Sequence, residues 1–334
     1  MADNEKLLEI HDLQVEYHSG GRVVHAVNGL DLSISEGETL GFVGETGAGK
    51  TSTALSILRI LPQPLSKVTG GTIRYRGKDL MAYDNRAMRQ IRGKEIAMIF
   101  QDPMTSLDPV KKVSEQIAEM IRLHEKLSPR EIHEKALHML EVVGIDRGRG
   151  NDYPHQFSGG MKQRVVIAMA LACNPSLLIA DEPTTALDVT IQAQVLELMK
   201  ELKKQYHMSM IMITHDLGIV AEICDNVAIM YAGKVVEYGS VREIYTRAAH
   251  PYTTALFDSI PSLTDDQEEL KVIRGLTPDP TSIPSGCAFH PRCPFATERC
   301  ARDTPGDTML GGTHTVKCFR CQPGEAEGKE PAHE

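Results

Sequence analysis

The chain lacks the long hydrophobic segments that are typical of membrane-spanning proteins. No stretch of its 334 residues reaches the ~20 unbroken apolar residues that a membrane-spanning helix needs. The longest uncharged run, residues 165–180, is interrupted by Asn174, Pro175 and Ser176. The first residues lack the basic and then apolar pattern of a secretory signal. We therefore expect a protein that reaches a membrane only through its partners.

The sequence also lacks an excess of positive charge. Its 36 Lys and Arg residues against 45 Asp and Glu residues give a net charge of -9, which argues against a general nucleic-acid-binding surface. Hydrophobic residues make up 41% of the chain and charged residues 24%, which suffices for a sizeable core. We expect a folded, soluble protein that does not bind nucleic acid.

Cysteine is scarce except in the last fifth of the chain. Cys173 and Cys224 lie alone in apolar surroundings. The other five cysteines are Cys287, Cys293, Cys300, Cys318 and Cys321. An odd number without a signal peptide indicates a reducing compartment and favours metal ligation over disulfides. Because this segment has few large apolar residues, four thiolates on one metal centre would supply its order, and free surface thiols are the alternative. Cysteine ligands alone do not distinguish a zinc site from an iron–sulfur cluster. The spacing of Cys318 and Cys321 is also typical of zinc sites.

A glycine-rich loop lies between a predicted strand and a predicted helix. Residues 39–43 form a short apolar run that is typical of a strand covered on both faces. Residues 51–61 have helical spacing, and Pro62 ends that helix. The loop between them satisfies G-x-x-x-x-G-K-[ST], in which backbone N–H groups and Lys50 contact phosphates and the Thr51 hydroxyl binds Mg²⁺. The predicted nucleotide-binding residues here are Gly44, Glu45, Thr46, Gly47, Ala48, Gly49, Lys50, Thr51 and Ser52.

Two more apolar runs, residues 177–180 and 210–213, are predicted as buried strands that end in polar residues. The first is followed by Asp181 and Glu182, and the second by His215. Sheets of α/β proteins place their ligands at such strand ends. Asp181 is suited to holding Mg²⁺ through a water, and Glu182 to polarising an attacking water.

The remaining pattern predicts a strand over residues 7–17, a strand pair over residues 23–34 and a hairpin over residues 227–238. Between these regions the periodicity becomes helical. Residues 112–124 and 129–143 are predicted helices, the second opened by a serine cap and a proline. They indicate an inserted helical subdomain.

Residues 157–164 read Phe-Ser-Gly-Gly-Met-Lys-Gln-Arg. Ser158 is a predicted N-cap, and Gly159 and Gly160 leave their backbone amides open. The helix predicted over residues 161–173 directs its positive end at whatever binds there, which suits an anion.

Together these motifs resemble the nucleotide-binding subunits of ATP-binding cassette transporters, and the resemblance covers residues 7–245. It implies an α/β P-loop NTPase with a RecA-like core, an antiparallel β subdomain and a helical subdomain at about residues 103–165. Phe157 and Met161 depart from the Leu and Gln usual in this family, but the serine and the amides are kept.

The resemblance also implies residue roles. Glu182, His215 and Gln101 become the catalytic glutamate, the switch histidine and the Q-loop glutamine, and Gln101 joins Thr51 and Asp181 as a Mg²⁺ ligand. The further residues expected to contact ATP are Tyr17, which stacks on adenine, the signature residues Ser158, Gly159 and Gly160, and Asp188 in the loop over residues 186–188. In the mechanism so implied, two subunits close head to tail on two ATP molecules, each lying between one P-loop and the partner's signature.

The C-terminal part is similar to the ATPase subunits of dipeptide and oligopeptide importers. The matching features are residues 250–253 (His-Pro-Tyr-Thr), residues 291–294 (Pro-Arg-Cys-Pro) and the cysteines. That group carries a [4Fe-4S] cluster, here implied on Cys287, Cys293, Cys300 and Cys318, with Cys321 spare or replacing Cys318. Iron–sulfur is therefore favoured over zinc.

The implied domain organisation is a nucleotide-binding domain over residues 1–249, a small irregular Cys-rich region over residues 250–321 and a disordered tail over residues 322–334. The implied function is ATP hydrolysis coupled to uptake of dipeptides or oligopeptides at the cytoplasmic face of the cell membrane. The implied partners are a second, related ATPase in a heterodimer, two transmembrane permease subunits and, indirectly, an extracytoplasmic binding protein.

The sequence favours this function over several alternatives. An importer ATPase for nickel or oligosaccharide is the nearest alternative, and a soluble redox-sensing ATPase is less favoured because no effector-binding element is evident. Cassette ATPases of genome maintenance carry long coiled coils, for which residues 101–158 are too short, and translation factors usually hold two cassettes where this chain has one.

Overall fold

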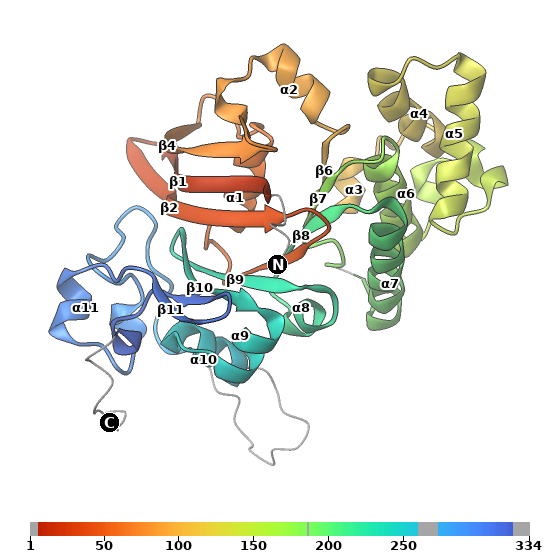
Figure 1. Ribbon diagram of the computed structural model, residues 1–334. Coiled ribbons are helices and arrows are strands. Elements are labelled where there is room, and N and C mark those ends of the chain that lie inside the picture. The colour runs from red at the N-terminus through yellow and green to blue at the C-terminus, as the bar shows by residue number, and fades with distance from the viewer. Residues whose placement is uncertain (1–5, 186, 260–272, 323–334) are drawn as a thin grey trace. The chain divides into compact units, whose positions relative to one another are not determined.

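The computed structural model describes residues 6–185, 187–259 and 273–322, and it divides into two compact units that we describe separately (Figure 1). The first, which we call the signature unit, contains Met1–Leu7, Ile34–Thr39 and Lys78–Ile213. The second, the P-loop unit, contains Leu8–Ser33, Leu40–Gly77 and Thr214–Glu334.

An antiparallel sheet in the P-loop unit has the strand order β2-β1-β4. The bounds are β1 (Lys6–Ser19), β2 (Arg22–Ser35) and β4 (Ser66–Tyr75). In β1 and β4, Val15 lies opposite Val68. This is the antiparallel β subdomain that the resemblance implied.

Residues 23–34, predicted as a pair of strands, form the single strand β2, so that prediction was wrong. The misleading signal is Asn28-Gly29 in the middle of the segment, which resembles a turn. Gly29 does adopt a positive φ of 84°, but it lies beside Asp12 of β1, whose own φ is 47°. The two residues form a local irregularity that the strands pass through without turning.

A second sheet in the P-loop unit contains strands from both ends of the chain. Its hydrogen-bonded order is β11 (Thr308–Gly311), β12 (His314–Val316), β10 (Lys234–Ser240), β9 (Asn226–Tyr231) and β3 (Thr39–Val43). β3 and β9 run parallel, and every residue of β3 is buried. β3 leads through the glycine-rich loop into α1 (Lys50–Ile57), which confirms the predicted sequence of strand, loop and helix.

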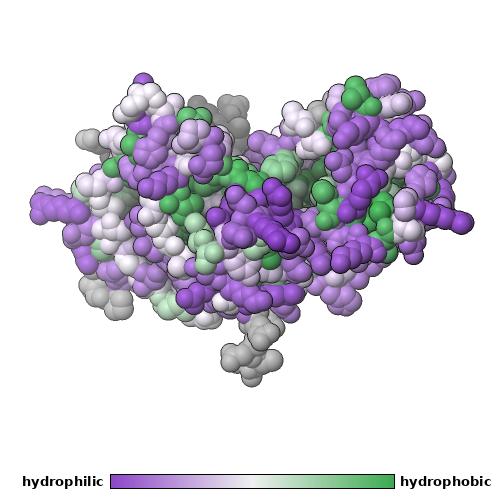
Figure 2. All heavy atoms as spheres, turned by 90° about the horizontal axis from the view of Figure 1, so that it is seen from above, coloured by the Kyte–Doolittle hydropathy of each residue, from purple (hydrophilic) through white to green (hydrophobic). Residues whose placement is uncertain are grey.

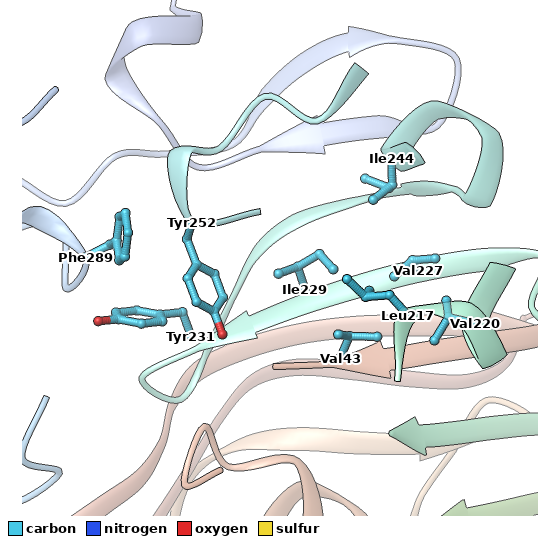
Figure 3. Close-up of a cluster of buried hydrophobic side chains, with 9 residues drawn as sticks. All are labelled: Val43, Leu217, Val220, Val227, Ile229, Tyr231, Ile244, Tyr252 and Phe289. Atoms are coloured by element: carbon cyan, nitrogen blue, oxygen red, sulfur yellow. The ribbon is translucent and has the colours of Figure 1, made fainter. Parts of the chain in front are cut away.

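The C-terminal part, expected to be irregular, contributes helices, strands and core residues to the P-loop unit. Its helices include α10 (Pro251–Asp258) and α11 (Glu298–Arg302). Figure 3 shows Phe289 beside Tyr252 and Tyr231 in a cluster of buried side chains. Large apolar residues are few here and Leu276 and Met309 are exposed, but Tyr252, Phe289 and Phe319 are buried. This burial explains the order that the faded periodicity did not predict.

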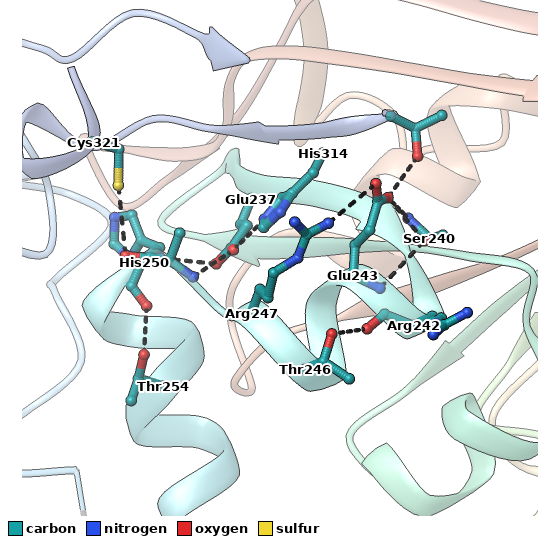
Figure 4. A network of polar contacts seen from close by, with 12 residues as sticks. Glu237, Ser240, Arg242, Glu243, Thr246, Arg247, His250, Thr254, His314 and Cys321 are labelled. Atoms are coloured by element: carbon teal, nitrogen blue, oxygen red, sulfur yellow. Dashed lines mark hydrogen bonds and ion pairs between the residues drawn. The ribbon is translucent and has the colours of Figure 1, made fainter. Parts of the chain in front are cut away.

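Buried polar contacts also join β10, β12 and the segment before α10 (Figure 4). Glu237 of β10 and His314 of β12 are almost fully buried, and their side chains meet at 2.7 Å. The Glu237 carboxylate accepts further hydrogen bonds from the backbone N–H groups of Ala249 and His250, at 2.7 and 2.9 Å. Each buried acceptor is thereby satisfied, as burial of a charged group requires.

The signature unit is built around a parallel sheet in the order β8-β7-β6. The bounds are β6 (Ile96–Ile99), β7 (Leu177–Asp181) and β8 (Ser209–Thr214). β7 and β8 are buried throughout, as predicted for residues 177–180 and 210–213. The long helix α7 (Val189–Tyr206) lies between them in the chain, as neighbouring parallel strands require a crossover connection.

Three helices of the signature unit pack on one another: α4 (Val113–His124), α5 (Pro129–Val142) and α6 (Gly159–Leu171). The first two match the helices predicted over residues 112–124 and 129–143. Ser128 and Glu131 form the capping box of α5, and Pro129 occupies its first turn.

The smaller helices are α2 (Asn85–Ile91), α3 (Pro103–Ser106), α8 (Leu217–Ile223) and α9 (Val241–Arg247). Among the described residues, no helix combines the length and the apolar character needed to cross a membrane. Hydrophilic residues cover most of the face seen in Figure 2, and the hydrophobic ones between them form small groups.

Candidate nucleotide-binding site

The P-loop curls around the head of its own lysine. Lys50 Nζ donates hydrogen bonds to the backbone oxygens of Gly44 and Glu45, at 2.6 and 3.1 Å. Gly49, at φ 103°, precedes the first turn of α1. A Cβ atom on Gly44 would lie only 2.2 Å from the Met230 backbone oxygen, so only glycine fits there. The loop therefore has the compact form that can surround a phosphate chain.

The other nucleotide residues predicted for this unit lie at strand ends. Tyr17 is near the end of β1, and its hydroxyl is 3.1 Å from the Ser52 hydroxyl in α1. Tyr17 is thus linked to the helix that follows the P-loop, which is compatible with a role beside the nucleotide. His215 follows β8, and the next residue, Asp216, caps α8.

In the signature unit, the structure brings together two predicted residues that are far apart in sequence. Gln101 Nε2 donates to Glu182 Oε2 at 2.9 Å, and the Thr185 hydroxyl donates to the same oxygen at 2.9 Å. Glu182 has a positive φ of 46°, uncommon for a residue other than glycine. Asp181, at the end of β7, is 3% exposed. A carboxylate oriented by a glutamine and a threonine, next to a buried acid, is a suitable place to activate water.

The signature loop begins α6 as predicted. The Ser158 hydroxyl accepts a hydrogen bond from the Met161 N–H at 3.4 Å. A Cβ on Gly160 would lie 2.4 Å from Cγ2 of Ile191 in α7. Asp188 caps α7 by accepting from the Ile191 N–H at 3.0 Å. Ala186, in the loop predicted to cross to a partner, lies outside the described residues.

Arg149 contacts the signature loop, although no sequence motif marked it as part of the site. Its guanidinium lies over the Phe157 ring at 4.3 Å, and Nη1 is 3.4 Å from the Met161 sulfur. It also donates to Asp152 and to the Gln156 backbone oxygen, at 2.8 and 3.0 Å. Both departures from the family pattern therefore contact one arginine.

The P-loop also contacts an arginine that lies far from it in the sequence. Arg292 donates to both carboxylate oxygens of Glu45, at 2.7 and 3.1 Å, and the Tyr252 hydroxyl accepts from the Glu45 N–H at 2.9 Å. Both residues lie in the segments that carry the family resemblance, residues 250–253 and 291–294, but no local pattern marks either as a neighbour of the P-loop.

The predicted site residues thus form two groups. Tyr17, the P-loop and His215 belong to the P-loop unit, whereas Gln101, Asp181, Glu182, Ser158, Gly159, Gly160 and Asp188 belong to the signature unit. Their roles toward ATP and Mg²⁺ stay predictions.

No disulfide joins the C-terminal cysteines that the structure describes. Cys287, Cys293, Cys300 and Cys318 line one small cavity together with Phe289 and Phe319. Burial raises the pKa of Cys287, and it raises the pKa of Cys293 to about 11. Within the described ranges, no three His, Cys, Asp or Glu side chains are arranged as a metal-binding group.

Cys321 differs from the other four cysteines of this region. It does not line their cavity, and its thiol donates to the Ala249 backbone oxygen at 3.8 Å. A hydrogen bond with Cys318 lowers the pKa of Cys321. Cys321 therefore lies outside the cavity but contacts Cys318, so its role as a spare thiol or as a replacement for Cys318 stays a prediction.

The fold and these loops define a P-loop ATPase of the cassette type. Residues 27–185 match the family described as ABC transporter, and residues 236–300 match the family described as the oligopeptide/dipeptide transporter, C-terminal region.

Relatives of similar length extend the match over nearly the whole chain. The dipeptide transport ATP-binding protein DppD of Bacillus subtilis is 49% identical over 317 residues, which are 94% of this chain and 95% of DppD. The oligopeptide transport ATP-binding protein OppD of the same organism is 49% identical over 329 residues, 98% of this chain and 92% of OppD. A putative peptide import ATP-binding protein of Brucella melitensis is 47% identical over 95% of this chain and 98% of its own. The chain therefore belongs to the ABC transporter family of ATP-binding proteins, and as a member of that family it is an ATPase.

Solved cassettes have the same fold. The ATP-binding cassette MJ0796, in a dimeric post-hydrolysis state bound to ADP and phosphate, matches with a TM-score of 0.63 and 26% identity over 70% of this chain and 99% of its own. The CbiO1 protein of Clostridium perfringens, part of the transporter complex CbiONQ, matches with a TM-score of 0.63 and 29% identity over 73% of this chain and 92% of its own.

Proposed function

We propose that this chain is the ATP-hydrolysing subunit of an importer of dipeptides or oligopeptides. The observation that carries the proposal is the similarity to DppD and OppD, at 49% identity across 94% and 98% of the chain. The match of residues 236–300 to the C-terminal region of such transporters supports it separately. The solved cassettes match 70% and 73% of the chain, so the similarity to DppD and OppD extends over more of it.

In the proposed mechanism, ATP binds to the P-loop with Lys50 at its β- and γ-phosphates and Tyr17 at its base. Thr51, Asp181 and Gln101 would hold Mg²⁺, which would neutralise charge on the phosphates. Glu182 polarises the attacking water, with His215 at the γ-phosphate. The contact of Gln101 with Glu182 supports this assignment, because the glutamine fixes the direction of the carboxylate. The signature residues Ser158, Gly159 and Gly160, with Asp188, contact the ATP bound to the opposing subunit.

The proposed partners follow from the same family. Two ATPase subunits close on ATP, and this motion is transmitted to two permease subunits fed by an extracytoplasmic binding protein. The second ATPase is proposed to be a related, different chain, and the complex to lie at the cytoplasmic face of the cell membrane. Nickel or oligosaccharide in place of peptide remains the alternative cargo.

The test is an anaerobic pull-down of the Glu182→Gln variant from native membranes in mild detergent with ATP and Mg²⁺. The substitution removes the proposed base and should accumulate the ATP-closed dimer. We expect mass spectrometry to identify a second ATPase, two multispanning proteins and a peptide-binding protein. Recovery of soluble proteins alone contradicts the proposal of an importer. Recovery of a nickel- or sugar-binding protein indicates that the cargo is nickel or oligosaccharide instead of peptide. Lys50→Ala, which should not retain ATP, is the matched control.

We propose further that Cys287, Cys293, Cys300 and Cys318 hold a [4Fe-4S] cluster. The fit rests on the four thiols that line one apolar cavity, which Cys321 does not line. Burial raises the pKa of Cys287 and Cys293, so a metal that binds there must displace their protons. Through its bonds to the four thiolates, the cluster would cross-link the C-terminal segment and stabilise it.

Iron, sulfide and zinc analysis of the anaerobically purified chain tests this proposal. We expect four iron and four sulfide per chain, with loss of both in Cys293→Ser and retention in Cys321→Ser. One zinc per chain supports the alternative metal, and the absence of all three contradicts a metal centre.

A further inference from the structure

The P-loop carries an acid close to where phosphate groups are expected to bind. Glu45 is the second residue of the loop, and its side chain is 24% exposed. A carboxylate in this position repels phosphate unless a cation neutralises it. The neutralising cation comes from the C-terminal part of the same unit.

Arg292 provides that cation with a bidentate contact. Its Nη1 and Nη2 donate to the two carboxylate oxygens of Glu45, at 2.7 and 3.1 Å, and its side chain is 5% exposed. The guanidinium also donates to the Arg274 backbone oxygen at 3.1 Å and to the Tyr231 hydroxyl at 3.3 Å. The hydrogen bond to Glu45 raises the pKa of Arg292, so the arginine stays charged. Such paired, planar contacts are the geometrically specific ones among ion pairs.

Tyr252 contacts the same residue through the backbone. Its hydroxyl accepts from the Glu45 N–H at 2.9 Å. The ring is fully buried, with its centroid 4.6 Å from that of Tyr231 and 5.4 Å from that of Phe289 (Figure 3). The cluster therefore fixes the hydroxyl that meets the loop.

These contacts extend to the phosphate-binding lysine. The Glu45 backbone oxygen accepts from Lys50 Nζ at 3.1 Å. Side chain, N–H and C=O of Glu45 are thus all engaged, the first two by the C-terminal part of the chain. A change in that part alters the charge and the conformation of the P-loop together.

We propose that Arg292 is a positioning residue for nucleotide binding, which neutralises Glu45 and fixes the P-loop in the form that receives phosphates. Nucleotide affinity then depends on the segment that bears Cys287 and Cys293. This inference rests on nucleotide binding at the P-loop but not on the identity of the cargo. A binding measurement on the full chain therefore tests it even if peptide import is wrong.

The test is a double-substitution cycle, with the dissociation constant for MgADP measured by calorimetry. We expect Arg292→Ala to raise it about tenfold, the scale of one lost charge-assisted contact. Glu45→Gln alone removes the repelling charge, and its own effect on the dissociation constant is the reference against which the double variant is compared. In the doubly substituted chain, Glu45→Gln should recover most of the loss. A tenfold loss that persists in the double variant contradicts the electrostatic role, and so does unchanged affinity in Arg292→Ala.

Two further variants separate this role from a general loss of structure. Arg302→Ala removes an exposed arginine of the same region, which pairs with exposed Glu298, and should leave MgADP affinity unchanged. Tyr252→Phe keeps the ring but removes the acceptor for the Glu45 N–H, and should raise the dissociation constant about threefold. If Arg292→Ala does not fold, unchanged affinity in Tyr252→Phe contradicts the proposal.

Steady-state kinetics give a second readout. Because Arg292 acts on binding through Glu45, we expect Arg292→Ala to raise KM for MgATP about tenfold and to change kcat by less than about threefold. Arg292→Lys should recover part of the loss, since it restores charge without the planar contact. A fall in kcat with KM unchanged contradicts the positioning role.

Thermodynamic linkage provides a reciprocal measurement. If the C-terminal segment favours nucleotide binding, bound nucleotide must stabilise that segment by the same free energy. We expect MgADP to slow amide hydrogen exchange over residues 287–293 in the unsubstituted chain, but not in the Arg292→Ala, Glu45→Gln double variant. Equal exchange with and without MgADP in the unsubstituted chain contradicts the coupling.

Discussion

The P-loop and the signature loop each contact an arginine from elsewhere in their own unit, but the two arginines meet different chemistry. Arg292 pairs with a carboxylate of the P-loop itself, at 2.7 Å. Arg149 meets no acid within the signature loop; it lies on the Phe157 ring and near the Met161 sulfur. The P-loop contact therefore controls charge beside phosphate, whereas the signature contact mainly supports packing.

The glycines of the two loops differ in a parallel way. Gly44 approaches a backbone oxygen, that of Met230, whereas Gly160 approaches a side chain, that of Ile191. A backbone neighbour cannot be removed by substitution, but a side chain can. The P-loop is thus fixed by main-chain packing, and the signature loop by side-chain packing that a second substitution can relieve.

The largest expected effect separates binding from hydrolysis. Glu182→Gln should lower kcat by about 10²- to 10⁴-fold, the usual contribution of a general base, while MgATP still binds. Lys50→Ala in the other unit should instead abolish MgATP binding, because the phosphates lose their fixed charge. Steady-state ATPase assays and equilibrium binding of MgATP measure the two properties.

The matched controls are exposed residues of the same types, Glu201→Gln and Lys67→Ala, which should leave both properties unchanged. Full hydrolysis by Glu182→Gln contradicts the role of this carboxylate.

The next effect concerns the two glycines. Gly160→Ala should destabilise the chain by about 1–3 kcal/mol, the usual cost of overpacking, and Ile191→Ala should restore much of this in the double variant. Gly44→Ala should lose MgADP binding as well, and Met230→Ala should not restore it, because the obstructing atom is a backbone oxygen. Denaturant unfolding and MgADP titration measure both. Equal rescue at the two sites is incompatible with this comparison.

A smaller effect is expected at Arg149. Arg149→Ala removes its stacking on Phe157 and should cost about 1 kcal/mol in the free energy of unfolding. Arg149→Lys should recover little of this, since an ammonium cannot stack as a planar group. MgADP affinity should stay unchanged in both, unlike in Arg292→Ala. A stability of Arg149→Lys equal to that of the unsubstituted chain contradicts the stacking role.

The smallest effect is a pH dependence in the P-loop unit. The backbone N–H of Ser240, with other hydrogen bonds, lowers the pKa of Glu243 from 4.5 to about 2 (Figure 4). Because the folded-state pKa lies below the unfolded value, this contribution is present above about pH 4.5 and is lost as the pH falls toward 2. Glu243→Gln should therefore cost about 1 kcal/mol at pH 7 and less at lower pH.

Urea unfolding of both chains at pH 7 and pH 4 measures that difference. A cost for Glu243→Gln that grows as the pH falls contradicts the assignment.

Features set by neighbouring residues were predictable from the sequence. The P-loop, the buried strand over residues 39–43 and the Ser128 cap each depend on spacing within a few residues. Hydrophobic periodicity fixed the helices over residues 112–124 and 129–143 to within one residue at each end. The strand pair over residues 23–34 was wrong because a turn-like dipeptide occurs inside a continuous strand.

Contacts between distant residues were not predictable in the same way. Arg292 and Glu45 are 247 residues apart, and no local pattern marks either as the partner of the other. The buried place of Phe289 likewise depends on Tyr231 and Tyr252 from other parts of the chain. Gln101 was predicted to lie at the site with Glu182 only through the family resemblance, since a single glutamine in a sequence does not by itself predict a functional role.

The measurement that tests the account most directly is peptide uptake. A strain that lacks this gene would be complemented with the unsubstituted chain or with Glu182→Gln at matched expression, and supplied with a radiolabelled dipeptide and a longer peptide. We predict that the unsubstituted chain restores uptake of at least one peptide and that Glu182→Gln restores none. Two results would contradict an ATPase that powers peptide import. In the first, Glu182→Gln restores uptake as well as the unsubstituted chain does, and in the second, the unsubstituted chain restores uptake of neither peptide.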